Sequence, residues 1–294
     1  MPKGIILKGV GGLYTVYSEG RTYSCKPRGV FRIKGVTPLP GDCCMFDIVD
    51  DELGFILEIL PRKNELIRPA VANVDIAAIV IALSSPEPDF YMVDKIIATC
   101  LVKKIEPILI ANKADTAKEE IWDTFLKNYA PTGLRYFKIS AKNETGFEDL
   151  LEYFDCKTVV FAGQSGTGKS TIINAIVGYE LMETGCISEK IERGRHTTRH
   201  TNFIHIKSGA FIADTPGFSN VEPEGIDEKE LHLYYPEFKP WIGQCKFQTC
   251  VHIKEPGCAV KEKVQQGSIG DLRYENYSRM YYRIMELNKQ KRGY

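Results

Sequence analysis

At 294 residues the chain is long enough for two or three domains, because most domains hold about 100–200 residues. Hydrophobic residues make up 44% and charged residues 26%, which are ordinary values for a globular protein with packed cores. The longest apolar runs are too short to cross a bilayer and the first residues lack a secretory signal, so we expect a cytoplasmic protein without a membrane partner.

The formal net charge is zero, yet the charges are unevenly placed along the chain. Residues 1–35 hold seven Lys or Arg against one acid, and residues 239–294 hold eleven against five. Two basic ends favour a polyanionic partner that is contacted at both. An unevenly charged solvated surface is the alternative.

The first 68 residues predict a small β-barrel. Short β-prone runs alternate there with Gly and Pro, and the basic, aromatic first half suits an oligonucleotide-binding fold. Spacing alone leaves an SH3-like barrel equally open. The expected strands are residues 11–17, 22–25, 30–33, 44–49 and 54–60.

From Val74 the pattern changes to alternating strands and helices, which predicts a doubly wound, mostly parallel sheet. The expected strands are residues 74–83, 107–111, 134–139, 158–162, 202–207 and 210–213. The expected helices are residues 90–104, 119–129, 146–154 and 170–177. Beyond Pro223 the strand pattern stops.

A guanine-recognition motif follows the second of these strands as Asn112, Lys113, Ala114 and Asp115. The Asp115 carboxylate can accept from both N1–H and the 2-amino group of guanine, whereas adenine offers no such donor pair. Ser140, Ala141 and Lys142 follow the next strand and are predicted to close over the base. Alone, the first motif could be a plain strand-end turn; its place in this series favours the functional interpretation.

A phosphate loop follows the strand at 158–162 and precedes an apolar helix, which is the context such a loop requires. Its backbone N–H groups would hold the α- and β-phosphates, Lys169 would bridge the β- and γ-phosphates, and the Ser170 hydroxyl would coordinate Mg²⁺. A glycine-rich turn with a surface lysine is the alternative. The predicted phosphate-binding residues are Gly163, Gln164, Ser165, Gly166, Thr167, Gly168, Lys169, Ser170 and Thr171.

Further groups around the γ-phosphate come from two later segments. Asp214 is predicted to hold Mg²⁺ through water, and the Gly217 N–H to sense the γ-phosphate. In the polar segment 193–200, Thr198 is our candidate to complete the Mg²⁺ shell. Phe218 stands where many such enzymes have a water-orienting glutamine, so intrinsic hydrolysis should be slow, on the order of 10⁻⁴ to 10⁻² s⁻¹.

His196 is the candidate within the chain to orient or deprotonate the attacking water, although a surface histidine without a role fits equally well. The predicted catalytic residues are Lys169, His196 and Thr198.

Three thiols and an imidazole near the C-terminus form the ligand set of a closed structural zinc site. Ordinary buried cysteines are the alternative, because the spacing departs from paired Cys-x-x-Cys knuckles. The predicted ligands are Cys245, Cys250, His252 and Cys258, and the six other cysteines are expected to be buried hydrophobes. A basic amphipathic helix follows, whose tyrosines either stack on bases or pack against the zinc module.

The base motif precedes the phosphate loop here, which is the reverse of an ordinary GTPase and indicates a circular permutation. With the barrel before it and the cysteine cluster behind it, the chain resembles the RsgA (YjeQ) family of small-subunit-dependent GTPases over essentially its whole length. The resemblance implies three parts: an oligonucleotide-binding barrel (1–68), a permuted GTPase (69–222) and a zinc-binding helical module (223–294).

The resemblance further implies binding of the small ribosomal subunit and its rRNA, a late role in subunit maturation, and GTP hydrolysis to GDP that the subunit stimulates. It also makes 196–198 the first switch and His196 catalytic, while Ala114 replaces a larger apolar residue common in the family. We expect a monomer without a DNA partner. Two other functions stay open from the residues: a GTP-gated RNA clamp without turnover, and a small-molecule phosphotransferase.

Overall fold

The computed structural model describes residues 1–28, 37–50, 52–183, 201–206, 208–214, 222 and 225–292, without the side chains of 179–183, 214, 291 and 292. The chain divides into two compact units. One consists of Met1–Ala78, Gly146–Phe161 and Lys169–Phe218, and the other of Ile79–Thr145, Ala162–Gly168 and Ser219–Tyr294. Among the described helices, none is both long and apolar enough for a membrane span.

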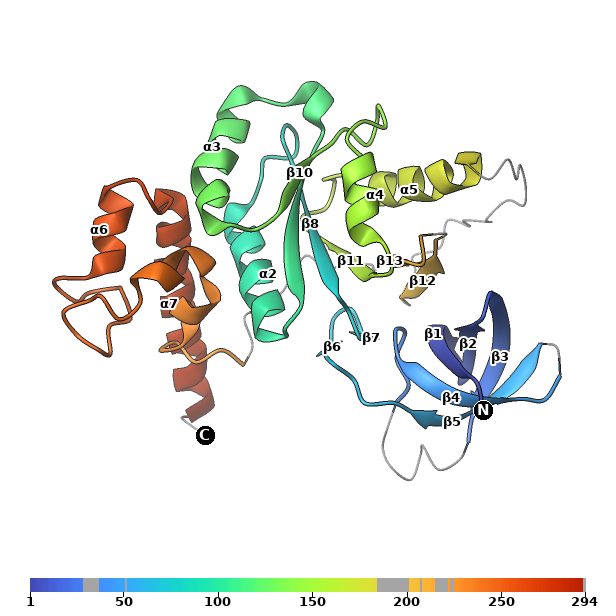
Figure 1. The fold of residues 1–294 in the computed structure, drawn as a ribbon. Coiled ribbons are helices and arrows are strands. Elements are labelled where there is room, and N and C mark those ends of the chain that lie inside the picture. Colours follow the sequence, from blue (N-terminus) through green and yellow to red (C-terminus); the bar gives the residue numbers. More distant parts are fainter. Residues whose placement is uncertain are drawn as a thin grey trace. The chain divides into compact units, whose positions relative to one another are not determined.

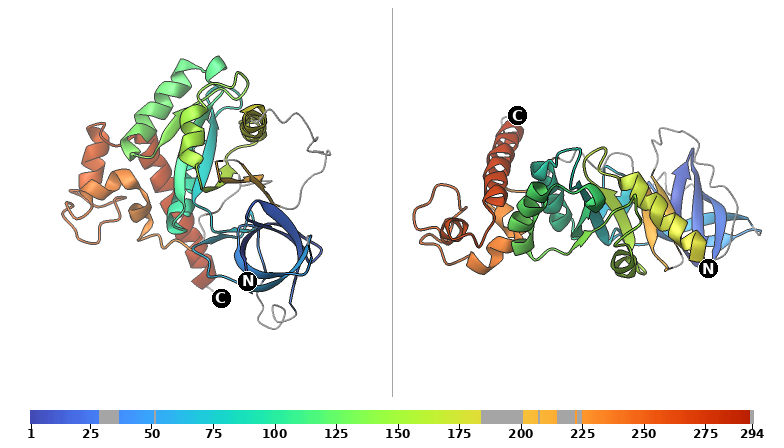
Figure 2. Two further views of the ribbon diagram at one scale, coloured as in Figure 1. Left: turned by 45° about the vertical axis from the view of Figure 1, so that its right-hand side comes forward. Right: turned by 90° about the horizontal axis from the view of Figure 1, so that it is seen from above.

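The N-terminal strands form a closed barrel in the order β1-β2-β3-β5-β4, seen as a blue ring in the left view of Figure 2. Strand β3 pairs in parallel with β5, and β1 closes the barrel by pairing antiparallel with β4. This Greek-key order is that of an oligonucleotide-binding fold, so it decides between the two barrels left open by spacing. The strands are β1 (Lys3–Val10), β2 (Leu13–Ser18), β3 (Arg21–Pro27), β4 (Cys43–Ile48) and β5 (Leu53–Ile59).

Two details of the barrel differ from the expected strands. Strand β1 was not expected, because its two glycines and two lysines weaken the β-prone pattern. Gly4 has a packing reason: a Cβ there would lie 2.3 Å from Val16 Cγ1 in the neighbouring strand. The strand expected at 30–33 lies outside the described residues.

The barrel core contains two of the cysteines expected to be buried, Cys25 and Cys44. Cys100 is also buried and Cys43 is half-buried, whereas Cys156 is exposed, which corrects the expectation for that residue. Cys156 lies in a turn after a helix and has a positive φ of 54°. Cys186 lies outside the described residues.

The predicted α/β domain is confirmed as a six-stranded sheet in the order β10-β9-β8-β11-β13-β12, labelled in Figure 1. The strands are β8 (Ile76–Ala82), β9 (Glu106–Asn112), β10 (Tyr136–Lys138), β11 (Thr158–Ala162), β12 (Asn202–His205) and β13 (Phe211–Asp214). The helices are α2 (Phe90–Val102), α3 (Glu119–Tyr129), α4 (Glu148–Phe154) and α5 (Lys169–Glu183). Short elements are β6 (Glu65–Leu66), β7 (Val71–Ala72), η1 (Ala114–Thr116) and η2 (Ala130–Thr132).

Strand register brings the predicted motifs to carboxyl ends of parallel strands, where ligands of such sheets bind. Strands β9 and β10 are parallel with Ala111 beside Lys138, so the base motif and the Ser-Ala-Lys segment begin at one edge. Strands β11 and β13 are also parallel, with Val160 beside Ala213. The phosphate loop and Asp214 therefore begin at a shared edge as well.

The C-terminal part is helical, as predicted. It contains η3 (Leu231–Tyr234), η4 (Pro236–Trp241), α6 (Ala259–Gln265) and α7 (Asp271–Arg292). Its buried core includes Tyr235, Phe238, Tyr277 and the ligand candidates Cys250 and Cys258, and it extends to Ala98 of α2. The third cysteine, Cys245, is partly buried against this core.

A buried ionic cluster joins α7 to η4 and α2. The Arg273 guanidinium donates to Glu237 Oε1 at 2.7 Å and to Asp94 Oδ1 at 2.5 Å, and all three side chains are at most 1% exposed. Asp94 also accepts from Tyr129 Oη at 2.8 Å and Asn276 Nδ2 at 2.7 Å. Each buried charge therefore has partners, as burial of charge requires.

Candidate nucleotide and zinc sites

Glycines shape the phosphate loop between β11 and α5. Gly163, Gly166 and Gly168 have φ values of 125°, 81° and 99°, a region that side chains disfavour. Space is also limited, since a Cβ would lie 2.4 Å from Val80 O at Gly163 and 2.3 Å from Asn112 Nδ2 at Gly168. The loop thus requires glycine for conformation and for close packing.

Asn112 ties the base motif to two other segments. Its buried Nδ2 donates to Thr167 O in the phosphate loop at 2.9 Å. Its Oδ1 accepts from Ala141 N at 3.0 Å, in the Ser-Ala-Lys segment. One amide therefore connects all three segments, which fits its predicted role of stiffening the loop.

Lys113 makes a second link between the base motif and the phosphate loop. Its Nζ donates to Gly166 O at 2.9 Å and to Ser85 O. The residue adopts a left-handed φ of 63°, which turns the chain so that Asp115 follows at the exposed rim. Ala114 is half-buried between them, and its small side chain leaves these contacts intact.

Asp115 is exposed and oriented by Ser140, whose Oγ donates to Asp115 Oδ1 at 2.6 Å. This hydrogen bond, helped by the charges of Lys142 and Lys113, lowers the pKa of Asp115 below its ordinary value. The carboxylate therefore stays ionised well into the acidic range, as an acceptor for two N–H donors must.

Lys169 begins α5 directly after the loop, and burial lowers the pKa of its ammonium group. Ser170 and Thr171 follow on the exposed first turn. Among the remaining loop residues, Gln164 Oε1 accepts from Asp89 N at 3.4 Å and Ser165 is exposed. Asp214 ends β13, but its side chain lies outside the described residues, as do His196, Thr198 and Gly217 entirely.

The segment after β8 is a part of this site that the sequence analysis missed. The backbone carbonyl of Ser85 accepts a hydrogen bond from Lys113 Nζ, and Ser84 Oγ lies 3.1 Å from Thr116 Oγ1. Pro86 borders the phosphate loop, since its Cδ would lie 3.5 Å from a Cβ added at Gly166. The signal available was positional, because a polar run that follows a buried strand in such a sheet stands at its ligand-binding edge.

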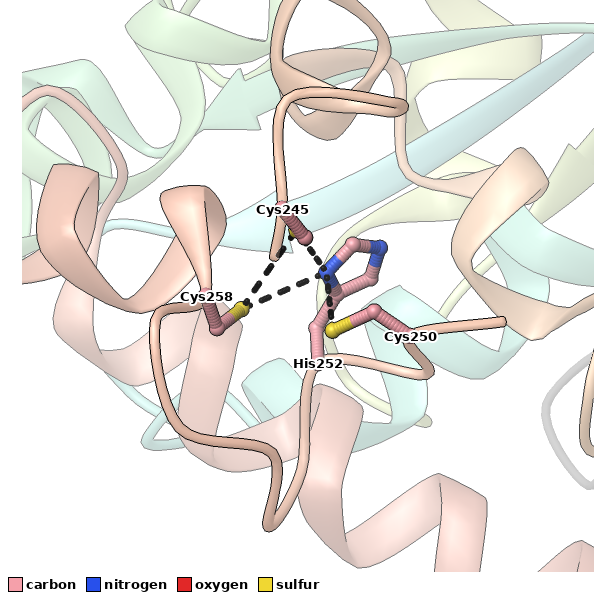
Figure 3. A group of neighbouring side chains, drawn as sticks. All are labelled: Cys245, Cys250, His252 and Cys258. Atoms are coloured by element: carbon pink, nitrogen blue, oxygen red, sulfur yellow. Dashed lines mark hydrogen bonds between the residues drawn. The ribbon is translucent and has the colours of Figure 1, made fainter. Parts of the chain in front are cut away.

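The four candidate zinc ligands converge, as Figure 3 shows. The Nδ1 atom of His252 lies 3.5, 3.6 and 3.4 Å from the Sγ atoms of Cys245, Cys250 and Cys258, and two of the sulfurs are 4.0 Å apart. A tetrahedral zinc ion with bonds of about 2.3 Å to sulfur and about 2.0 Å to nitrogen spaces its ligands at roughly 3.5–3.8 Å. The donor set therefore fits zinc in kind and in spacing.

Neighbouring groups hold the ligand loop in place. Tyr274 and Tyr277 of α7 donate to His252 O at 2.8 Å and Val251 O at 2.6 Å. Glu255 accepts backbone N–H groups from residues 251, 253 and 254, each at 3.0 Å. For these two tyrosines, packing against the zinc module is confirmed over stacking on bases.

Comparison with known proteins places this geometry in a family. The RsgA GTPase family model matches residues 59–224, and the RsgA N-terminal domain model matches residues 3–56. A Ruminiclostridium cellulolyticum protein named small ribosomal subunit biogenesis GTPase RsgA is 46% identical, over 99% of this chain and 96% of its own. The protein of that name from Bacillus velezensis is 41% identical, over 97% and 98%.

Two solved structures agree along the whole chain. YjeQ from Thermotoga maritima has a TM-score of 0.84 and 33% identity, over 97% of this chain and 98% of its own. YloQ, described as a circularly permuted GTPase, has a TM-score of 0.81 and 35% identity, over 97% and 96%. The barrel and the permuted GTPase core therefore match known proteins, and the chain belongs to the RsgA family of GTP hydrolases.

Proposed function

We propose that this GTPase binds the small ribosomal subunit and its 16S rRNA, assists late subunit maturation, and hydrolyses GTP to GDP and phosphate faster on the subunit. The names of its relatives support the subunit as partner. The barrel's oligonucleotide-binding topology and the two basic ends support contact with RNA. We propose that it acts as a cytoplasmic monomer without a DNA or membrane partner.

Guanine selection is assigned to Asp115, with Ser140, Ala141 and Lys142 closing over the base. The observation that carries this assignment is the joined loop, in which Asn112 connects the base motif with the phosphate loop while Ser140 orients Asp115. Because an amide at 115 would offer a donor to the 2-position, Asp115→Asn should shift preference from GTP to xanthosine triphosphate. Competition binding of GTP and xanthosine triphosphate measures this change in preference. An unchanged GTP affinity of the variant would contradict the assignment of guanine selection to Asp115.

Phosphate and magnesium chemistry is assigned to α5 and its loop. Backbone N–H groups of residues 163–171 would hold the phosphates, and Lys169 would bridge the β- and γ-oxygens. Ser170, Thr198 and Asp214 would hold Mg²⁺, which neutralises charge that develops on those oxygens when it is bound. We propose that His196 orients the attacking water and that the Gly217 N–H senses the γ-phosphate.

The three parts proposed for this function are the barrel (1–68), the permuted GTPase (69–222) and the zinc module (223–294). All four zinc ligands come from the protein, so the ion would stabilise the module and would leave no open position for substrate.

Co-sedimentation with purified small and large subunits, each with GDP and a non-hydrolysable GTP analogue, tests the partner. We expect binding to the small subunit and stronger binding with the analogue. Multiple-turnover phosphate release with and without small subunits tests the enzyme. Binding without stimulated release would instead support the GTP-gated clamp, and equal binding to both subunits would contradict the proposed partner.

A further inference from the structure

Three aromatic rings join the barrel to the edge of the GTPase sheet, within one compact unit. Tyr17 of β2 packs on His205 of β12, with ring centroids 4.3 Å apart and planes at 32°. The Tyr17 ring also meets Phe211 of β13 edge-on at 5.7 Å, and His205 lies 4.8 Å from Phe211. The three rings are therefore in mutual contact.

The register of the β12–β13 hairpin shows that this contact belongs to one of its faces. His205 and Phe211 are direct cross-strand partners, so their side chains lie on the same face. Phe203, two residues before His205, shares that face and is 5% exposed. Its ring would lie 3.3 Å from a Cβ placed at Gly41, in the segment leading into β4. The barrel thus covers this face at two points.

The same hairpin carries a residue assigned to the magnesium site. Asp214 ends β13 and pairs with Asn202 across the hairpin. On its other side β13 runs parallel to β11, whose next residues form the phosphate loop. The position of Asp214 along this edge is therefore set by a strand pair that rests on the barrel.

We propose that Tyr17 is a positioning residue for GTP hydrolysis: by packing on His205 and Phe211, it fixes the hairpin whose last residue, Asp214, is the proposed Mg²⁺ ligand. This inference rests on the proposed role of Asp214. Because Tyr17 belongs to the barrel and contacts the hairpin through His205 and Phe211, its effect should appear in magnesium dependence rather than in nucleotide affinity without metal.

The test compares full-length, zinc-loaded Tyr17→Ala and Tyr17→Phe with Phe55→Ala, an exposed aromatic of β5 in the same barrel. Intrinsic GTP turnover is measured against Mg²⁺ concentration, and GDP affinity is measured in EDTA. The loss of aromatic contacts of this kind changes an equilibrium constant by roughly three- to tenfold. We expect Tyr17→Ala to raise the half-saturating Mg²⁺ concentration by about that factor, whereas Tyr17→Phe and Phe55→Ala should match the parent.

If Tyr17→Ala fails to fold, as judged by circular dichroism, Phe211→Leu removes the partner ring while keeping an apolar side chain, and the same Mg²⁺ shift is expected. Folded variants that keep the parent's magnesium dependence would overturn the proposal. A parent protein whose turnover needs no Mg²⁺ would instead refute the magnesium site itself, so the two failures are distinguishable.

Discussion

Single glycines in the phosphate loop carry a steric requirement that can be tested against a helix glycine nearby. Gly168 has a positive φ, and a Cβ there would meet Asn112 Nδ2 at 2.3 Å. Gly178, inside α5, has nothing within 4 Å of an added Cβ. Gly168→Ala should lower GDP affinity by at least about tenfold, because it strains the loop and displaces the Asn112 link.

The matched Gly178→Ala should leave GDP affinity unchanged and stabilise the protein by about 1 kcal/mol, as expected for alanine in a helix. Titration calorimetry and thermal unfolding measure both effects. Equal affinities for the two variants would contradict the steric account.

The zinc ligands predict a pH dependence with a definite sign. Without metal, burial raises the pKa of Cys250 to about 12 and raises that of Cys258, so both thiols hold protons near neutrality. Burial lowers the pKa of His252 to about 4, so its imidazole is already neutral there. Zinc must displace at least these two protons, and its affinity should therefore rise by at least about 100-fold per pH unit between about pH 6 and 8.

Chelator competition at several pH values measures this slope, after correction for the protonation of the chelator. A zinc affinity independent of pH over that range would show that these thiols are not the ligands.

The sequence predicted which segments come together at the base motif, the phosphate loop and the cysteine cluster, because each motif combines a fixed spacing with a strand or helix at its border. Ser85 and Pro86 could not be predicted in this way. Ser85 takes part through its backbone carbonyl, and Pro86 only limits the space beside Gly166, so neither role can be recognised from the residue type. The contacts of Tyr17 could not be predicted either, because its proposed role depends on which strand lies next to the barrel.

At the level of elements, the buried cluster around Arg273 fastens α7 to α2 and η4. Removing Arg273 would leave Asp94 and Glu237 buried without their cation. Arg273→Ala should therefore lower the free energy of unfolding by about 3–5 kcal/mol. The pair between Lys127 of α3 and Asp271 of α7 is an exposed control, with both side chains over 60% accessible. Lys127→Ala should cost only about 0–1 kcal/mol.

Chemical denaturation of the zinc-loaded protein measures the unfolding free energy of both variants. Similar losses would show that the buried cluster does not stabilise the protein more than the exposed pair. The sequence predicted α7 as a basic amphipathic helix, but it did not predict that one of those basic residues is 1% exposed. Periodicity shows which face of a helix is apolar. It does not show that acids from other elements, here Asp94 and Glu237, pack against a basic residue on that face.

For the whole molecule, the two basic ends predict how subunit binding depends on salt. Each phosphate contact that a Lys or Arg makes should contribute about −0.9 to the slope of log affinity against log salt concentration. Lys8 of β1 and Lys289 of α7 are exposed, and Lys157 is an exposed control between α4 and β11. Lys8→Gln and Lys289→Gln should each make the slope shallower by about one, and Lys157→Gln should not.

Co-sedimentation at several salt concentrations gives these slopes. If all three variants kept the slope of the parent protein, neither end of the chain would contact RNA. The domain order and the α/β character could be predicted from the sequence, because they follow from motif order and periodicity. Strand β1 could not be predicted, because its glycines are required for packing and lower its strand propensity.

The closure of the barrel restricts how anything can attach to it. Because β1 pairs with β4 and β3 pairs with β5, the backbone N–H and C=O groups of the barrel strands hydrogen-bond to one another. An incoming chain cannot extend such a sheet by lying alongside it, and two copies cannot associate edge to edge. Recognition there must come from side chains on the outer wall and from the turns, so changes in affinity should follow substitutions at those positions and not changes in backbone pairing.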